Sequence, residues 1–213
     1  YADTNEESAS SKTVSVIPST PMELPLIVDF EGDLAHWDFE NTWGLSTSQS
    51  HSGTHSLSDS PNGNYASDQN SSTTFGPVSL LGYSAAQLSF WTKFDLESNY
   101  DYVYVEVSNN NKSWTELEQF NGTQSTWVDK TYDLNSYLGS AIYIRFRLTS
   151  DGSVTKDGIN IDDFEISVTG DADLQPVRVF AGWSGISSYL LPFQTEMDEL
   201  LNQKQQILDY REQ

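Results

Sequence analysis

The chain has 213 residues, of which 31 are acidic and 10 basic, so its formal net charge is −21 at pH 7. This charge disfavours nucleic acid and anionic membrane surfaces as partners, because both attract clustered Lys and Arg, and it suits divalent cations, a saline exterior or simple solubility. A hydrophobic share of 37% is enough for a core, whereas the absence of cysteine excludes disulfides and thiolate metal sites.

The first 25 residues, YADTNEESASSKTVSVIPSTPMELP, are rich in Ser, Thr, Glu and Pro and carry little periodicity. We interpret residues 1–25 as a linker, in which Val14, Val16 and Ile17 are the side chains able to contact a domain. The chain contains no run of about 18 apolar residues, so no membrane insertion is expected.

Three runs after Ile27 alternate apolar and polar residues with period two: QLSFWTKFD (87–95), YDYVYVEVS (100–108) and AIYIRFRLTS (141–150). Clusters of Asn, Gly and Ser separate them, which is typical of an antiparallel sheet with one buried face. The stretches WTELEQFNG and STWVDKTYDL add shorter strands. The spacing predicts an all-β fold over residues 26–169, an antiparallel β-sandwich or jelly roll of about eight to ten strands.

The character of the sequence changes after residue 170. The stretch QPVRVFAGWSGISSYLLPF is apolar with small residues, and TEMDELLNQKQQILDYREQ spaces Met197, Leu200, Leu201 and Ile207 about one helical turn apart. We expect residues 170–213 to be a C-terminal extension with a short helical segment, either the start of a further module or a packing helix.

Two adjacent aspartates, Asp162 and Asp163, lie in the strand-like stretch DGINIDDFEIS (157–167). Neighbouring strand residues point to opposite faces, so one carboxylate should face the interior, where it is costly unless paired. The apolar phase slips by one residue between Ile161 and Phe164. Such a slip predicts a β-bulge, which would turn both carboxylates toward an edge of the sandwich.

A second acidic stretch, DFEGD, places Asp29, Glu31 and Asp33 at period two near the start of the domain. First and last strands of a sandwich commonly pair, so we expect Glu31 to converge with Asp163, with Asp33 and Asp162 as further candidate ligands. Converging carboxylates repel one another unless a cation lies between them, and Ca²⁺ takes six to eight oxygen ligands. We therefore favour a calcium site here over separate solvated carboxylates.

Three further loops, SDSPNGNY (58–65), DLESNYD (95–101) and SDGSVTKDG (150–158), are dense in Asp, Glu, Asn and Ser. If they meet, they can form a second ion site; ordinary turn chemistry explains the same composition equally well, and both interpretations remain open. The candidate ligands are Asp59, Asn62, Asn64, Glu97, Asp101, Asp151 and Asp157.

The outward sides of the three alternating runs carry several aromatic and arginine side chains. If these strands are neighbours, they form a face that can stack sugar rings or dock a protein. Alternatively, the aromatics are simply packed beneath the linker or the tail. The residues are Trp91, Tyr102, Tyr104, Tyr143, Arg145 and Arg147, with the loop aromatics Tyr65 and Tyr100 as further sugar contacts and Trp37 and Trp43 expected in the core or beside the ion.

No recognised catalytic constellation is present. None of His36, His51 and His55 precedes a Glu as the zinc motif H-E-x-x-H requires, and GWSGI lacks the last glycine of G-x-S-x-G. Paired carboxylates also occur in glycosidases, but clustered acids at a sandwich edge are better explained as ion ligands. We do not expect an enzyme.

Several long stretches carry a family resemblance: HSGTHSLSDSPNGNY, LSFWTKFDLESNYDYVYVEVSNNNKSW and GTQSTWVDKTYDLNSYLGSAIYIRFRLTSDGSVTKDGINIDDFEIS. Over residues 28–168 the chain resembles the MAM-like jelly-roll module of secreted bacterial peptidases of the immune inhibitor A type. The resemblance implies an extracellular, non-catalytic β-sandwich of the concanavalin-like or galactose-binding-like kind, attached to larger secreted or surface proteins and often containing calcium.

The frame FEGD … HSGTHSL … IDDFEI is also similar to that of carbohydrate-binding jelly rolls. In those modules a structural calcium lies between a Glu of the first motif, a carbonyl near the HSG turn and an Asp of the last. Transferred to this chain, these ligands are Glu31, the region of Ser52, and Asp163. The tail GWSGISSYLLPF resembles segments that follow such modules in surface proteins of Bacteroidetes-like bacteria.

These observations together predict a non-catalytic, calcium-stabilised extracellular accessory module that mediates protein or surface interactions within a larger secreted polypeptide. The alternative is a carbohydrate-binding module that uses the aromatic face of the same sandwich. The expected partner is a protein or glycan at the cell exterior.

Overall fold

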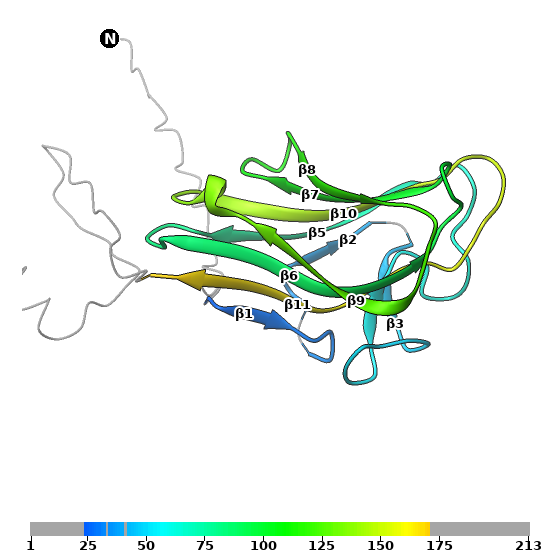
Figure 1. Ribbon diagram of the computed structural model, residues 1–213, viewed down its shortest axis with the longest axis horizontal. Helices are drawn as coiled ribbons and strands as arrows, with labels where there is room; N and C mark the ends of the chain where they lie inside the picture. The colour runs from blue at the N-terminus through cyan, green and yellow to red at the C-terminus, as the bar shows by residue number, and fades with distance from the viewer. Residues whose placement is uncertain (1–23, 33, 41, 171–213) are drawn as a thin grey trace, which may run out of the picture. The chain divides into compact units, whose positions relative to one another are not determined.

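The computed structural model describes residues 24–32, 34–40 and 42–170 (Figure 1). Residues 1–23 of the predicted linker, the C-terminal extension after residue 170 with its helical segment, and Asp33 lie outside this described part. The described residues form eleven strands and one short 3-10 helix, η1 (Asn135–Tyr137). They contain no helix long and apolar enough to cross a membrane.

The strands build two antiparallel sheets packed face to face, which confirms the predicted all-β sandwich (Figure 1). The first sheet runs in the order β3-β4-β11-β6-β9, and β1 also pairs with β11. Its strands are β1 (Leu26–Val28), β3 (Gly44–Ser46), β4 (Ser56–Ser58), β6 (Ala85–Asp95), β9 (Thr123–Asp133) and β11 (Gly158–Thr169). The second sheet, in the order β2-β5-β10-β7-β8, consists of β2 (Trp37–Phe39), β5 (Asn70–Ser79), β7 (Tyr102–Ser108), β8 (Thr115–Phe120) and β10 (Ala141–Thr149).

Alternation along the strands fills the space between the sheets. On β10 the buried residues are Ile142, Ile144, Phe146 and Leu148, which is the phase that the sequence predicts. Trp37 lies among the core aromatics, with its ring centroid 5.0 Å from that of Phe75 and 5.2 Å from that of Phe164. Each fully buried aliphatic or aromatic side chain contributes about 1.5–3 kcal/mol, so this layer accounts for most of the driving force for folding.

The distribution of the alternating runs between the sheets differs from the expectation. β7 and β10 are neighbours, but β6 belongs to the other sheet, where it pairs with β11 and β9. Period-two alternation fixes which face of a strand is buried but carries no information about which sheet receives that strand. Trp91, on β6, is therefore separated from the aromatic residues of β7 and β10.

The predicted β-bulge is present in β11. The pairing of β11 with β6 shifts between Asp162 and Glu165, and Asp163 adopts a positive φ of 47°. The opposite edge of β11 is shared: β4 pairs with it before the bulge, at Ile161, and β1 pairs with it after the bulge, from Phe164. The double aspartate thus lies at the seam between two short strands.

Gly158, at the start of β11, packs closely against the side chain of Asp59, and this contact can be tested. Its φ is +84°, and a Cβ there would collide with the carboxylate of Asp59. We expect Gly158→Ala to lower the free energy of unfolding by about 1–3 kcal/mol from backbone strain alone. Gly152→Ala is the matched control, because its Cβ would meet only an ordinary contact 3.4 Å from Asp68. Urea unfolding measures both, and equal losses would contradict the packing described.

Candidate metal centres and binding face

Asp162 is fully buried and is held by backbone amides. Its Oδ2 accepts N–H bonds from His51 (2.7 Å) and Ser52 (3.0 Å), and its Oδ1 accepts the N–H of Asp163 (2.8 Å). Burial raises the pKa of this carboxyl, while the three N–H bonds oppose that rise. The carboxylate is therefore buried beneath the turn at residues 51–55, on the side of the strand that also carries Trp91, rather than between the sheets. Amides of that turn and of Asp163 compensate it, and no ion pair of the described residues reaches it.

Asp163 binds the side chains of the same turn. One of its oxygens lies 2.5 Å from Nδ1 of His51, and the other accepts the hydroxyl of Ser52 at 2.5 Å. The His51 ring in turn stacks on Trp91, with centroids 3.9 Å apart and an interplanar angle of 10°. The bulge thus fastens the first half of the 51–55 turn to the outer side of the six-stranded sheet.

Glu31 holds the second half of the turn. Its carboxylate accepts the N–H and hydroxyl of Thr54 (2.6 and 2.8 Å) and the N–H and Nδ1–H of His55 (2.5 and 2.9 Å). The side-chain bond from His55, followed by the bonds from Thr54, lowers the pKa of Glu31 from 4.5 to about 2. Gly53 permits the approach, because a Cβ there would lie 2.5 Å from Oε1 of Glu31.

Glu31 and Asp163 therefore converge on opposite halves of one turn, as the pairing of β1 with β11 requires. Each of their four carboxylate oxygens already accepts at least one bond from that turn. The hydroxyl of Ser52 can rotate and offer an oxygen lone pair to a cation, but the backbone N–H donors cannot. The carboxylate oxygens of Glu31 and Asp163, which could bind a metal ion, are thus already engaged in hydrogen bonds within the protein.

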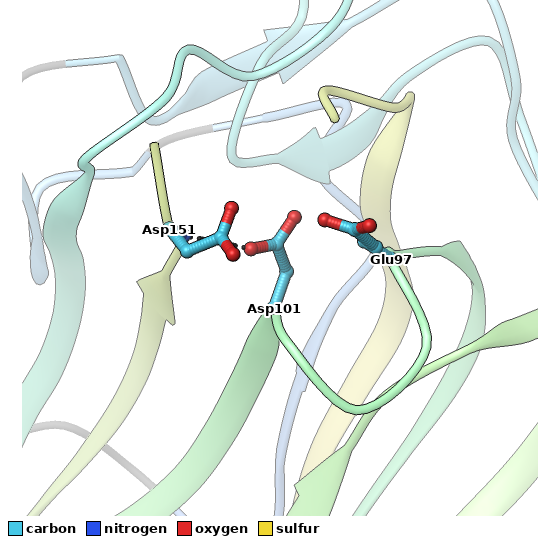
Figure 2. Close-up of side chains that lie close together, drawn as sticks. All are labelled: Glu97, Asp101 and Asp151. Carbon is cyan, nitrogen blue, oxygen red and sulfur yellow. Dashed lines mark hydrogen bonds between the residues drawn. The ribbon is translucent and has the colours of Figure 1, made fainter. Parts of the chain in front are cut away.

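A different acidic cluster lies at one end of the sandwich, where the loop between β6 and β7 meets the loop after β10 (Figure 2). Carboxylate oxygens of Glu97, Asp101 and Asp151 lie within 4.8 Å of one another. Asp101 is fully buried, accepts the Tyr65 hydroxyl at 2.5 Å and accepts the N–H of Asp151 at 2.8 Å. Among the ion pairs of the described residues, none joins a cationic side chain to this cluster.

The other four candidates of the second predicted site lie apart from this cluster or contact other groups. Asp59 is buried and accepts the Ile159 N–H at 2.6 Å, and burial raises its pKa to about 7. Asp157 accepts Nε2 of Gln49 at 2.9 Å, and Asn64 donates to the carbonyl of Thr155. Asn62 and Asp157 line a separate, serine-rich hollow of about 320 Å³.

The five-stranded sheet carries the part of the predicted aromatic face that belongs to β7 and β10, without Trp91 of β6. Arg145 Nε donates to Glu106 Oε2 at 2.7 Å, and Arg147 forms a fork onto both oxygens of the same carboxylate. Although burial raises the pKa of Glu106, the arginines more than offset this and lower it. Each guanidinium also covers an aromatic ring, Arg145 that of Trp114 at 4.1 Å and Arg147 that of Tyr104 at 4.2 Å.

Two residues of the predicted aromatic set do not belong to this face. Trp91 lies on the other sheet, as described above, and Tyr65 is only 2% exposed, because its hydroxyl is drawn inward to Asp101. Tyr100, by contrast, is 62% exposed. The sequence analysis did not include Trp114, which precedes β8 in a loop, or Glu106, which pairs directly with Arg145. The outward phase of Glu106 in the run 100–108 was the available signal.

Comparison with known proteins identifies the family. The family described as Immune inhibitor A-like, MAM domain, matches residues 60–175, more than half of the chain. This chain belongs to that family. The resemblance noted in the sequence is thereby confirmed.

Three relatives match this MAM domain in part, and two of them are peptidases by name. Bacillopeptidase F of Bacillus subtilis (strain 168) is 36% identical over 106 residues, covering 49% of this chain and 7% of that protein. Pre-pro-metalloprotease PrtV of Vibrio cholerae is 26% identical over 46% of this chain and 12% of its own length. Immune inhibitor A of Bacillus thuringiensis subsp. alesti is 24% identical over 43% and 15%. The chain therefore spans at most 15% of these relatives.

Solved structures with a similar chain trace include two β-sandwich domains. The K3 cleaved adhesin domain of Lys-gingipain from Porphyromonas gingivalis w83 aligns with a TM-score of 0.49 and 19% identity, covering 67% of this chain and 98% of that one. The xylan-binding domain from CBM 22 aligns with a TM-score of 0.48 and 13% identity, covering 68% and 95%.

The amide cradle of Asp162 predicts a specific loss of stability. Asparagine has one acceptor oxygen and one NH₂ group, so Asp162→Asn must turn a donor toward at least one backbone N–H. We expect the free energy of unfolding to fall by about 1–3 kcal/mol, measured by urea denaturation in the presence of a chelator. Glu165→Gln, on the same strand beyond the bulge, is the control, and an equal effect of the two changes would refute the cradle.

The lowered pKa of Glu31 predicts a pH dependence. Its ionised form stabilises the fold above the unfolded pKa of 4.5, and this contribution disappears as the pH falls toward about 2. We expect Glu31→Gln to be less stable than the natural chain at neutral pH and to lose less stability across that acid window. Unfolding midpoints measured through the window test this, and parallel curves for the two proteins would count against it.

Proposed function

We propose that this chain is a non-catalytic, calcium-stabilised accessory module that acts outside the cell as part of a larger polypeptide and mediates contact with a protein or a surface. Membership of the Immune inhibitor A-like MAM family carries the proposal. The relatives are peptidases of which this domain matches no more than 15%, which supports a role beside a catalytic part rather than as that part.

The arrangement of the acidic and imidazole side chains supports a non-catalytic role. Both His51 and His55 use Nδ1 on carboxylates that fasten their own turn, and Asp162 is closed off by three amides. A general acid or base needs contact with a bound substrate, and these groups instead bind one another.

The calcium part of the proposal rests on the cluster of Glu97, Asp101 and Asp151. Three carboxylates within 4.8 Å repel one another strongly, and they include the buried Asp101. Hard oxygen ligands from separate loops are the donors that Ca²⁺ selects. We propose these three residues as ligands. A second predicted locus consists of Glu31, Asp33, Ser52, Asp162 and Asp163. Of these, the carboxylates of Glu31, Asp162 and Asp163 already accept hydrogen bonds within the protein.

The calcium proposal predicts the direction in which calcium and a chelator change the thermal stability. Calcium at 100 times its Kd should stabilise the fold by about 2.7 kcal/mol and raise the melting temperature, whereas a chelator should remove that gain. Asp151→Asn should abolish most of the calcium-dependent shift and leave the chelated protein as stable as before or more so, because one repelling charge is removed. Calorimetric melts with calcium and with chelator measure both effects.

The matched control is Asp157→Asn, which lies in the same 150–158 loop but contacts Gln49. It should keep the full calcium shift. If instead Asp163→Asn abolishes the shift and Asp151→Asn does not, the ion belongs to the seam at the β11 bulge; Asp171, outside the described residues, serves as control for that variant. No shift in any protein, with no ion in native mass spectra, would remove calcium from the proposal.

Carbohydrate binding is the second candidate function. The observation that favours it is the cluster of half-buried aromatic side chains on the five-stranded sheet, where Tyr102 and Tyr104 lie 6.2 Å apart beside two arginines. Aromatic planes offer an apolar surface and a polar edge together, which suits ligands with both characters. This face is the surface through which we propose that the module meets a glycan.

A further inference from the structure

Two rows of side chains cross the outer face of the five-stranded sheet. Directly paired residues of neighbouring strands point to the same side, so the strand pairing defines each row. The first row is Asp38, Thr74, Arg145, Glu106 and Glu116. The second is Glu40, Ser72, Arg147, Tyr104 and Gln119.

The charges of these rows have a simple order. Both arginines lie at the centre, on β10, and both contact Glu106. The other acids lie at the two rims: Asp38 and Glu40 toward β2, and the exposed Glu116 on β8. The face therefore carries four carboxylates against two guanidinium groups, on a chain whose formal net charge is −21. A polyanionic ligand that reached the central arginines would therefore be repelled by the carboxylates at both rims.

The central arginines are fixed donors with unused capacity. Glu106 binds Nε of Arg145 and Nε and Nη2 of Arg147, so both planes are held in place. Among the hydrogen bonds of the described residues, the Nη groups of Arg145 have no acceptor, and the two arginine side chains are 20% and 23% exposed. Preorganised donors of this kind lose little entropy when a hydroxyl group binds.

Aromatic rings flank these donors along the strands. Tyr143 and Thr149 lie six residues apart on β10, roughly 20 Å at about 3.3 Å per residue, and Thr149 pairs with Tyr102. One side of the Trp114 ring and one side of the Tyr104 ring are covered by guanidinium groups. The rings of Tyr102 and Tyr143 are therefore the stacking positions at the two ends, far enough apart for a chain of sugars rather than a single one.

From these features we infer that this face binds an uncharged polysaccharide and discriminates against acidic ones. The inference rests on the carbohydrate-binding candidate function and names its ligand class. Tyr102 and Tyr143 stack the sugar rings, the Nη groups of Arg145 bind hydroxyls between them, and Asp38, Glu40 and Glu116 repel uronic acids at the rims.

The test uses the full 213-residue chain and soluble polysaccharides of two classes, measured by affinity electrophoresis and titration calorimetry. The probes are uncharged xylan, galactan and glucan, with polygalacturonate as the acidic counterpart. We expect an uncharged polymer to bind with little dependence on salt and polygalacturonate to bind weakly at low salt. Tyr102→Ala and Arg145→Gln should each weaken binding of the uncharged polymer about tenfold.

Two further variants separate recognition from folding. The rim double variant Asp38→Asn with Glu116→Gln should strengthen polygalacturonate binding and leave the uncharged polymer unaffected, since only the repulsion changes. Trp91→Phe, on the other sheet, should bind like the natural chain. Unfolding curves of all variants show that any loss of binding occurs in folded protein.

The outcomes are distinguishable. Binding of polygalacturonate as tight as that of uncharged polymers, or loss of binding on Trp91→Phe but not on Tyr102→Ala, would overturn the inference while leaving carbohydrate binding intact. Failure of every polysaccharide to bind would overturn the carbohydrate function itself, and the inference with it, and would leave the protein-contact role as the proposal.

Discussion

The structure depends on the accommodation of one buried charge, the carboxylate of Asp162. A lone buried carboxylate would cost several kcal/mol, and no cationic side chain pairs with Asp162, which lies beneath the 51–55 turn, among the described residues. The bulge in β11 resolves this, because it aims the carboxylate at the backbone N–H groups of His51 and Ser52. The same bulge divides the edge of β11 between β4 and β1, so the charge and the strand order of this sheet are fixed together.

Buried negative charge is compensated in different ways at different places in this acidic chain. Amide donors hold Asp162, and two guanidinium groups hold Glu106, which is 8% exposed at its side chain. Glu97, Asp101 and Asp151 have no cationic partner among the described ion pairs, although Asp101 accepts the Tyr65 hydroxyl and the Asp151 amide, and Asp151 accepts the amide and hydroxyl of Ser153. The convergence of three carboxylates without a cationic partner is the physical reason for proposing the cation at this cluster before the seam.

Sequence periodicity predicted the buried faces of β6, β7 and β10 and the bulge at Asp162. Both features depend only on the order of apolar and polar residues along a single strand. It did not predict that β6 joins the other sheet, since that depends on pairing between distant segments. The inward turn of Tyr65 was likewise not predictable, because its cause is the position of Asp101, 36 residues further along the chain. Of the second predicted ion site, the loop composition indicated seven candidates, and only the fold selects Glu97, Asp101 and Asp151.

The proposed ion and the proposed binding face are linked through the strands that carry them. Asp101 immediately precedes Tyr102, the first residue of β7, and Asp151 lies two residues after Thr149, the last residue of β10. Tyr102 and Thr149 are themselves paired across the sheet. A cation held by Asp101 and Asp151 would therefore clamp the end of the strand pair at which Tyr102 presents its ring. Arg145 and Glu106 lie further along the same strands and are fixed by their own bonds, so loss of the ion would act first on the stacking position and leave the central polar contacts in place.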